Sequence, residues 1–448
     1  MENLDATIIV TAIPRMAESF GISATRASLG ITAYVLATAA CIPASGWLAD
    51  RLGARNLFCA AIGLFTLSSM ACGAAPGFLT FIIARVMQGC AAAMMSPVGR
   101  LVVLRNADKR DLMQALSTLV WPALFAPVLG PPLGGFITGA ATWRWIFYVN
   151  VPIGLAGMAL VLAYIPNQRQ DERTRFDARG FVLMAITLAC LTYGIDVLGA
   201  APINLPLGVG LLGAALLTGL WAVRHLSAVA QPVVRLDALR RRSFFVACVS
   251  GGSVSRAAIS ATPFLLPLLF QVGFGLSPVV SGLLLLLYMS ANLLMKTVTN
   301  PILRRFGIRN VLLYNGALAS ASIALCALLS PALPALVGAL ILVLAGASRS
   351  MQFTAITFVT FADITPDERA SASVLFSLMQ QIGMAMGVAI GALMINASHL
   401  LRGGQSLSVA DFQIALVLAG VLSALALFSY AGLEASAGAE ITGHSAKT

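Results

Sequence analysis

Apolar stretches of about twenty residues recur along the whole chain, and they constrain its fold more than any other feature. A helix needs about 20 residues to cross the roughly 30 Å hydrocarbon core of a bilayer. With 59% hydrophobic and 10% charged residues, the composition lies outside the range of soluble globular proteins. We therefore predict an all-α polytopic membrane protein of fourteen spans, the first of them partial. The stretches are 1–14, 27–48, 56–75, 78–98, 113–138, 145–165, 180–198, 205–223, 244–271, 277–297, 311–329, 333–357, 370–395 and 411–432.

The basic residues indicate how these spans are oriented. An even number of spans puts both termini on one side of the membrane, together with alternate loops and the C-terminal tail. These loops and the tail hold 21 of the 28 lysines and arginines. Because cytoplasmic loops carry an excess of basic residues, this side is predicted to be cytoplasmic. The loops are 49–55, 99–112, 166–179, 224–243, 296–310 and 362–369.

One cytoplasmic loop occurs twice, which indicates two related halves. The sequence "DRLGARN" at 50–56 recurs as "RRFGIRN" at 304–310, on the same predicted side of the membrane. Repeats in parallel orientation are typical of transporters whose two helical bundles are related by an axis along the membrane normal.

The domain boundaries follow from this repeat and from the order of the spans. We predict an N-terminal six-helix bundle at 1–165 and a C-terminal six-helix bundle at 244–432. Two linking transmembrane helices with their cytoplasmic loops occupy 166–243, and 433–448 form a cytoplasmic tail.

Five motifs, in order along the chain, resemble those of the major facilitator superfamily. "GWLADRLGARN" at 46–56 resembles the motif between its second and third helices, "RVMQG" at 85–89 its fourth-helix motif, and "LGPPLGG" at 129–135 the fifth-helix motif of its antiporters. "LDATIIVTAIP" at 4–14 and "WRWIFYVNVPIG" at 143–154 resemble signatures of its fourteen-span drug:proton antiporters, the EmrB/QacA type. The resemblance implies a proton-coupled transporter.

Asp5 and Arg85 are the candidate proton-coupling residues. An ionised carboxylate inside a span is costly, and burial favours its protonated form, so Asp5 can exchange a proton. Arg85 lies about eight residues into its span and needs a partner, for which we consider Asp5, Gln88 or a substrate group. The structural alternatives are an Asp5 that only packs against a polar neighbour and an Arg85 bonded to helix ends. The resemblance implies proton transfer for both.

The gate and conformational motifs are rich in glycine. The resemblance implies a cytoplasmic latch formed by the first loop, although its charges could also simply anchor topology, and Arg304 replaces the acid in the second copy. Small residues allow close helix approach, and we expect Gly383, Gly387 and Gly391 to form a flat face where the two bundles rock. The candidate residues are Gly46, Asp50, Arg51, Gly53, Gly89, Gly130, Pro131, Gly134, Gly135, Arg304, Arg305 and Gly307.

Substrate contacts are harder to locate, because varied drugs need adaptable aromatic, Met and amide side chains rather than a fixed motif. Each candidate could equally pack in a helix core or face lipid. Two of them, Arg256 and Arg349, either face a water-filled cavity or meet backbone carbonyls. The candidates are Gln88, Met94, Trp121, Phe125, Arg256, Arg349, Gln352, Gln380 and Gln381.

We predict that the chain exports small amphipathic compounds, lipophilic or cationic, across a bacterial cytoplasmic (inner) membrane. It would work by alternating access with both termini cytoplasmic, driven by the proton gradient, without a cofactor or metal and without enzyme activity. The alternatives are a carrier of the same superfamily for one metabolite and, in another class, a non-transporting membrane protein. No nucleic acid is expected as a partner, and no feature indicates a periplasmic adaptor.

The first span looks too short. A helix over residues 1–14 extends only about 21 Å at about 1.5 Å per residue. Relatives carry further apolar residues ahead of the corresponding motif. We hypothesise that Met1 is an internal methionine of a longer chain or that the start was assigned too late.

Overall fold

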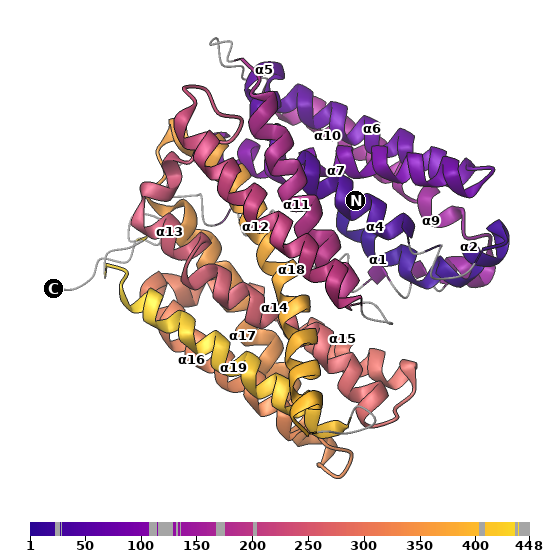
Figure 1. Cartoon of the computed structure of the whole chain (residues 1–448), viewed down its shortest axis with the longest axis vertical. Helices are drawn as coiled ribbons and strands as arrows, with labels where there is room; N and C mark the ends of the chain where they lie inside the picture. Colours follow the sequence, from indigo (N-terminus) through magenta and orange to yellow (C-terminus); the bar gives the residue numbers. More distant parts are fainter. Residues whose placement is uncertain are drawn as a thin grey trace.

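The computed structural model is all-helical, with no strand among the residues it describes (Figure 1). It describes residues 1–22, 27, 29–106, 114, 129–130, 133–134, 136–166, 175–199, 204–402, 408–434 and 438. Within these, ten helices are long and apolar enough to cross a membrane, or eleven if one bent pair counts as a single span. The predicted span 113–138 lies mostly outside the described residues, so the count of fourteen stays a prediction.

The N-terminal half starts with a broken helix and continues with long ones. The first segment has three parts, α1 (Glu2–Ile8), the 3-10 turn η1 (Ile9–Ala12) and α2 (Ile13–Phe20). The second span is the pair α4 and α5, bent by 62°. The remaining elements are α4 (Leu29–Cys41), α5 (Ala44–Leu52), α6 (Ala54–Ala74), α7 (Phe78–Asn106), α9 (Trp145–Tyr148) and α10 (Asn150–Tyr164).

The C-terminal half repeats this pattern after two linking helices. The linking helices are α11 (Ala178–Gly199) and α12 (Leu205–Ala228), and α11 packs against α4 of one half and α18 of the other. The half itself comprises η2 (Asp237–Arg240), α13 (Arg242–Cys248), α14 (Gly251–Leu268), the π-turn η3 (Leu269–Gly273), α15 (Pro278–Phe306), α16 (Ile308–Leu325), η4 (Cys326–Leu328), α17 (Ala335–Ala362), η5 (Pro366–Glu368), α18 (Arg369–Arg402) and α19 (Val409–Ala431).

The repeated loops have the same backbone geometry. Gly53 joins α5 to α6 at φ 84°, and Gly307 joins α15 to α16 at φ 76°. Positive φ is disfavoured for residues with a Cβ atom, which explains why both copies keep glycine. Each glycine carbonyl also accepts a hydrogen bond four residues on, from the N–H of Leu57 or Val311. The loop similarity therefore extends to three dimensions.

A second correspondence links the halves through close helix packing. A Cβ atom added to Gly89 of α7 would lie 2.5 Å from the carbonyl oxygen of Tyr34 on α4. One added to Gly346 of α17 would lie 2.1 Å from the carbonyl oxygen of Tyr288 on α15. The α4–α7 and α15–α17 pairs thus pack through the same contact between a glycine and a tyrosine carbonyl.

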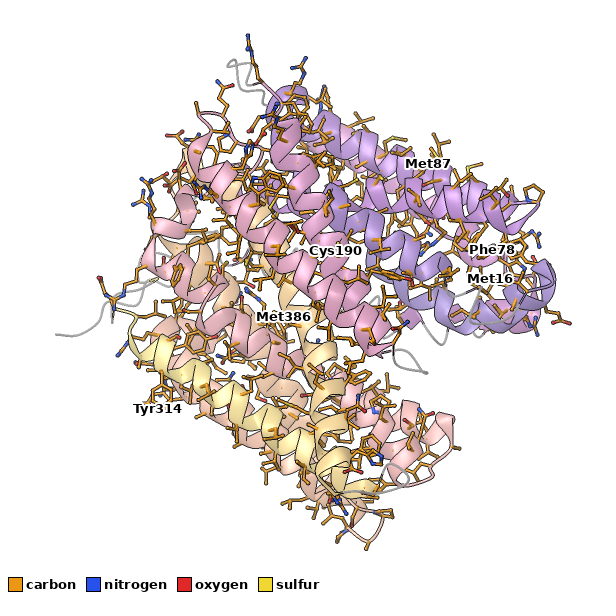
Figure 2. The ribbon with its side chains drawn as sticks, viewed as in Figure 1. Met16, Phe78, Met87, Cys190, Tyr314 and Met386 are labelled. Carbon is orange, nitrogen blue, oxygen red and sulfur yellow. The ribbon has the colours of Figure 1, made fainter. Side chains whose placement is uncertain are left out.

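The hydrophobic core is shared between the halves at one end of the molecule only. Its largest cluster includes Ala49 and Ala54 of the first half and Leu303 and Ile308 of the second, all beside the repeated loops 50–56 and 304–310. At the opposite end each half has its own cluster; that of the first half includes Met16, with Phe78 packed against it (Figure 2). In Figure 1 the halves meet near α5 and α13 and diverge towards α2 and α15.

Large apolar side chains cover the outer surface, as expected for helices in lipid. Tyr314 of α16 and Met87 of α7 lie on the outer edges of the two halves (Figure 2) and are 76% and 47% exposed. The linking helices α11 and α12 pack on each other through a hydrogen bond between the hydroxyls of Thr187 and Thr218. Leu216 and Leu217 of α12 are 64% and 70% exposed.

Three predictions are wrong in their placement. Lys296 and Arg100 were assigned to loops but lie inside α15 and α7, because both helices continue past the end of their most apolar stretch. The face with Gly383, Gly387 and Gly391 packs on α14 of its own half, where added Cβ atoms would meet Arg256, Ala257 and Phe264. It joins two helices within the C-terminal half rather than the two bundles.

Candidate functional site

Asp5 is buried in the N-terminal half, on a helix held by close contacts. It lies in α1, is 1% exposed, and donates its backbone N–H to the carbonyl of Met1. Two residues further along α1, Thr7 contacts the fifth-helix motif, since a Cβ atom added to Gly130 would lie 2.1 Å from the Thr7 hydroxyl. The glycine at 130 therefore lets the helix that carries Asp5 pack closely.

Asp5 and Arg85 form a fully buried ion pair. The Arg85 Nη1 donates to Asp5 Oδ2 at 2.6 Å and to Gln88 Oε1 at 2.6 Å. Gln88 closes the triangle by donating its amide N–H to Asp5 Oδ1 at 3.0 Å. Arg85 and Gln88 are both fully buried, one turn apart on α7. The two partners considered for Arg85 on sequence grounds, Asp5 and Gln88, thus both bind it.

Asn150 is a third donor to the carboxylate. Its side-chain N–H lies 2.9 Å from Asp5 Oδ1 and 3.0 Å from the Ser69 hydroxyl. Ser69 in turn donates to the backbone carbonyl of Phe147 at 2.9 Å. Asn150 is the first residue of α10, so side chains of α7 and α10 meet at the carboxylate of α1, and α6 adjoins it through the bond between Ser69 and Asn150.

The rest of the Arg85 guanidinium is held by neutral groups. Its Nε donates to the Gly30 carbonyl at 3.1 Å, and its Cζ lies 4.3 Å from the centre of the Tyr34 ring. Its Nη2 has no hydrogen-bond partner among the described residues. A cation over an aromatic face gains electrostatic attraction when water is excluded, which stabilises Arg85 without a second acid.

This arrangement is suited to a proton-dependent change of packing. With Asp5 ionised, the pair is neutral overall and well hydrogen-bonded, the condition under which a buried pair is tolerated. Protonation of Asp5 would remove the counter-charge of Arg85, and breaking a buried pair costs about 3–5 kcal/mol. A cost of that size is enough to shift an equilibrium between two packings of the same helices.

The other candidate substrate residues are dispersed. Met94 packs in the core cluster that both halves share, and Gln88 belongs to the Asp5 cluster. Gln352 is fully buried between α16 and α17, where it accepts from Asn315 and donates to the Leu312 carbonyl. This geometry favours a packing role for Gln352. Gln380 and Gln381 are half-buried on α18, and Trp121 and Phe125 lie outside the described residues.

Arg256 and Arg349 both lie in the middle of their spans. The Arg256 Nη1 donates to the Ala247 carbonyl at 3.1 Å. Of the two alternatives left by the sequence, a water-filled cavity or a backbone carbonyl, this atom has the backbone partner. Its Nη2 is buried without a hydrogen-bond partner among the described residues. Arg349 is half-buried, with its Nη1 3.5 Å from the Tyr288 hydroxyl and its Cζ 5.5 Å from the centre of the Phe353 ring.

Several gate residues lie where the two halves touch. A Cβ atom added to Gly46 would lie 3.0 Å from a methyl group of Val374, so α5 contacts α18 at this glycine. Asp50 and Arg51 lie in the last turn of α5, and Arg51 is exposed with its Cζ 5.2 Å from the centre of the Trp47 ring. The corresponding Arg304 and Arg305 end α15 and are exposed.

The fifth-helix motif is described only in part. Gly130 contacts Thr7 as above, and the Gly134 carbonyl accepts from the Thr138 hydroxyl at 2.7 Å. Pro131 and Gly135 lie outside the described residues.

Asn150, Ser69 and Lys296 are buried polar residues that were not predicted from the sequence. Asn150 stands inside the quoted motif "WRWIFYVNVPIG", so a polar residue in an otherwise apolar run was the available signal. Ser69 carries no such signal, because serines in spans commonly bond their own helix. Lys296 is 8% exposed and donates to the Thr354 hydroxyl. It falls where the predicted span 277–297 and the predicted loop 296–310 overlap, and it was counted as a loop residue.

Comparison with known proteins gives the family. The family model described as "Major Facilitator Superfamily" matches residues 1–388 of this chain. A relative from Klebsiella pneumoniae (strain 342) is 36% identical over 418 residues, covering 91% of this chain and 86% of its own. One from Serratia proteamaculans (strain 568) is 36% identical over 404 residues, covering 89% and 83%. Both bear the name MdtD, which associates them with multidrug resistance.

Two solved structures share the fold. The human organic anion transporter MFSD10 (TETRAN) has a TM-score of 0.65 at 14% identity and covers 96% of each chain. The proton:xylose symporter XylE, solved with 6-bromo-6-deoxy-D-glucose, has a TM-score of 0.62 at 15% identity and covers 97% of this chain and 94% of its own. At sequence identities of 14% and 15%, these two structures show a similarity of fold alone. With the family description matched over most of its length, the chain belongs to the Major Facilitator Superfamily.

Proposed function

We propose that this chain is a proton-coupled exporter of small amphipathic compounds, a multidrug efflux transporter that works by alternating access. The buried Asp5–Arg85 pair, held by Gln88 and Asn150, is the observation that carries the proposal. An ionised carboxylate in a span is costly, so such residues generally mark a functional site. Protonation of this one would leave the charge of Arg85 without its counter-charge. The names of the MdtD relatives support the substrate class.

The transport cycle follows from the charge of Asp5. Deprotonation on the cytoplasmic side would accompany substrate loading and restore the pair with Arg85. Protonation from outside would free Arg85 and accompany substrate release. The proton gradient supplies the energy in this cycle, so no bound cofactor is required.

The shared core on the cytoplasmic side supports an outward-facing arrangement of the halves. Hydrogen bonds between the halves join α7 to α18, from Arg100 to the Ser377 hydroxyl at 2.8 Å and from the Ser373 hydroxyl to the Pro97 carbonyl at 2.8 Å. Opposite these contacts the cores are separate. We place the protein in a bacterial cytoplasmic membrane with both termini inside.

Replacing Asp5 tests the coupling. We expect Asp5→Asn to abolish uphill export while leaving membrane insertion intact, because the amide cannot release a proton. The measurement is substrate-evoked proton release from acidified inside-out vesicles. Asp237→Asn is the matched control, since its carboxylate is 42% exposed in η2 and pairs only with Arg235 among the described residues. Undiminished export by Asp5→Asn would contradict the mechanism.

The same vesicles separate this function from transport of a single metabolite. An exporter of varied amphipathic compounds should release protons in response to several chemically unrelated substrates. A carrier for one metabolite should respond to that compound alone. Silence towards every compound, with the protein shown to be present, would contradict the proposed function.

A further inference from the structure

We propose that the C-terminal half binds the negatively charged group of the substrate, so that the exported compounds are amphipathic anions. This inference rests on the proposed function and names its substrate class. It reverses the sign of charge expected from the sequence, which was a lipophilic or cationic substrate. The observation behind it is a set of three basic side chains in the middle third of their candidate spans that have no acidic partner among the described residues.

The basic residues of the two halves differ in their partners. In the N-terminal half, Arg85 is neutralised by Asp5 at 2.6 Å. In the C-terminal half, Arg256, Lys296 and Arg349 each lie in the middle third of their span. None of the three has a carboxylate within 4.0 Å among the described residues. Basic side chains at this depth are costly, and they pair with an opposite charge or mark a substrate path.

Arg256 is the strongest member of the set. It is 1% exposed, and its Cβ atom lies 3.0 Å from the position of a Cβ atom added to Gly383, so its stem is held against α18. Its Cζ lies 4.9 Å from the centre of the Phe376 ring. One guanidinium nitrogen, Nη1, bonds to the Ala247 carbonyl, whereas Nη2 is buried without a hydrogen-bond partner among the described residues. A fixed cation with an open donor is the chemistry that binds a carboxylate or sulfonate.

Lys296 and Arg349 both lie at the contact between α15 and α17. Lys296 of α15 donates to Thr354 of α17, and Arg349 of α17 lies 3.5 Å from Tyr288 of α15. These partners are neutral hydroxyls, which bond to a cation without cancelling its charge. The helices adjoin α14, which carries Arg256. Three adjoining helices thus contribute one uncompensated positive charge each.

The aromatic side chains beside these cations suit the apolar part of such a compound. Phe376 stands beside Arg256, and Phe353 and Tyr288 stand beside Arg349. An amphipathic anion offers a charged group to the arginine or lysine and a ring to these faces. A lipophilic cation would meet the same three positive charges and be repelled, because like charges in a site of low polarity cost most.

A matched pair of probes tests the sign of the charge. The compounds 2-naphthoate and 2-naphthylmethylammonium share a ring system and differ in the charge of the head group. We expect the full-length protein in lipid nanodiscs to bind 2-naphthoate at least tenfold more tightly, measured by isothermal titration calorimetry. Equal affinity, or tighter binding of the cation, would overturn the inference without any variant being made.

Two substitutions locate the site. Arg256→Gln is expected to weaken 2-naphthoate binding about tenfold or more while leaving the ammonium compound no weaker, and Arg256→Lys should retain part of the affinity. Lys296→Gln serves as a second variant if Arg256→Gln does not fold. Arg179→Gln, which removes an exposed charge at the start of α11, is the control of equal charge change. An equal loss in Arg179→Gln and Arg256→Gln would assign the effect to overall charge and overturn the site.

Proton release distinguishes this inference from the proposed function. If 2-naphthoate binds and evokes proton release from inside-out vesicles, both hold. If it binds through Arg256 but neither it nor any other compound evokes release, the anion site holds and proton-coupled export fails. If only cations evoke release and 2-naphthoate does not bind, export holds and the anion site fails.

Discussion

At the scale of single residues, Asn150 is the member of the Asp5 cluster that is hardest to recognise from the sequence. Its side chain is one of three that donate to the carboxylate among the described residues. Asn150 and Gln88 are the uncharged donors, and Arg85 is the charged one. A hydrogen bond to a charged group contributes about 1.5–3 kcal/mol, and its loss leaves a buried acceptor less satisfied. The residue therefore affects how readily Asp5 takes part in coupling without carrying a charge itself.

We predict that Asn150→Ala lowers the rate of uphill export about tenfold, since about 1.4 kcal/mol corresponds to a factor of ten. Substrate-evoked proton release from inside-out vesicles measures this rate. Asn310→Ala, which removes an exposed amide near the start of α16, controls for the loss of an asparagine. A similar rate in Asn150→Ala and the unmodified protein would show that the hydrogen bond to Asp5 has no part in coupling.

The sequence predicted Asp5, Arg85 and Gln88 as members of this cluster but not Asn150 or Ser69. A carboxylate and an arginine inside apolar spans are visible without a structure, because their cost in lipid requires an explanation. Asn150 and Ser69 carry no such cost when each can bond within its own helix. The contact of Asn150 with Asp5 and that of Ser69 with Asn150 depend on how separate spans pack, which no local pattern specifies.

At the scale of helices, single glycines set how closely the spans approach. Gly89 on α7 leaves room for the Tyr34 carbonyl of α4, and the Thr38 hydroxyl reaches the Gly89 carbonyl at 3.2 Å. Small residues at helix contacts are the main means of close packing in membranes, where the hydrophobic effect does not draw helices together. Because Arg85 is one turn away on α7, the same contact also places the guanidinium over Tyr34.

We predict that Gly89→Ala lowers the unfolding temperature of the detergent-solubilised protein, by the equivalent of about 1–3 kcal/mol for an overpacked contact. The added Cβ atom would lie 2.5 Å from a backbone oxygen, which cannot move as a side chain can. Gly63→Ala on α6 is the control, since a Cβ atom there meets nothing within 4 Å. If both variants unfold at the same temperature, the close approach of α4 and α7 is not limiting.

The sequence indicated these glycine contacts only by motif. The sequence assigned Gly130 to a packing motif and Gly89 only to a conformational motif, and it placed the partner of the Gly383 face in the wrong half. Glycine spacing shows that one helix has a flat face and does not show which neighbour covers it. The helix ends were similarly misjudged at Arg100 and Lys296, because a charged residue inside a long helix resembles the start of a loop in a hydropathy pattern.

At the scale of the whole molecule, the described contacts between halves gather at the end that carries the repeated loops. Arg100 of α7 bonds to Ser377 of α18, and its Cζ lies 4.5 Å from the centre of the Phe376 ring. Arg369 at the start of α18 donates to the Leu104 carbonyl. The loop repeat predicted two halves in parallel orientation, and it could not predict which end they close, because alternating access needs the same chain to close at either end.

The contacts of Arg100 imply that this residue helps to hold the end with the repeated loops closed. We predict that Arg100→Ala shifts the population towards states with that end open, because the variant loses a hydrogen bond and a cation–aromatic contact that exist only when α7 meets α18. Spin labels at Leu52→Cys and Phe306→Cys, equivalent exposed positions of the two repeats, report the distance between the two repeated loops. The distance is measured by double electron–electron resonance in a protein without the native cysteines. Arg224→Ala on the exposed face of α12 is the control. Longer separations in Arg100→Ala alone are expected, whereas identical distance distributions in both variants would mean that the shared apolar core closes this end without Arg100.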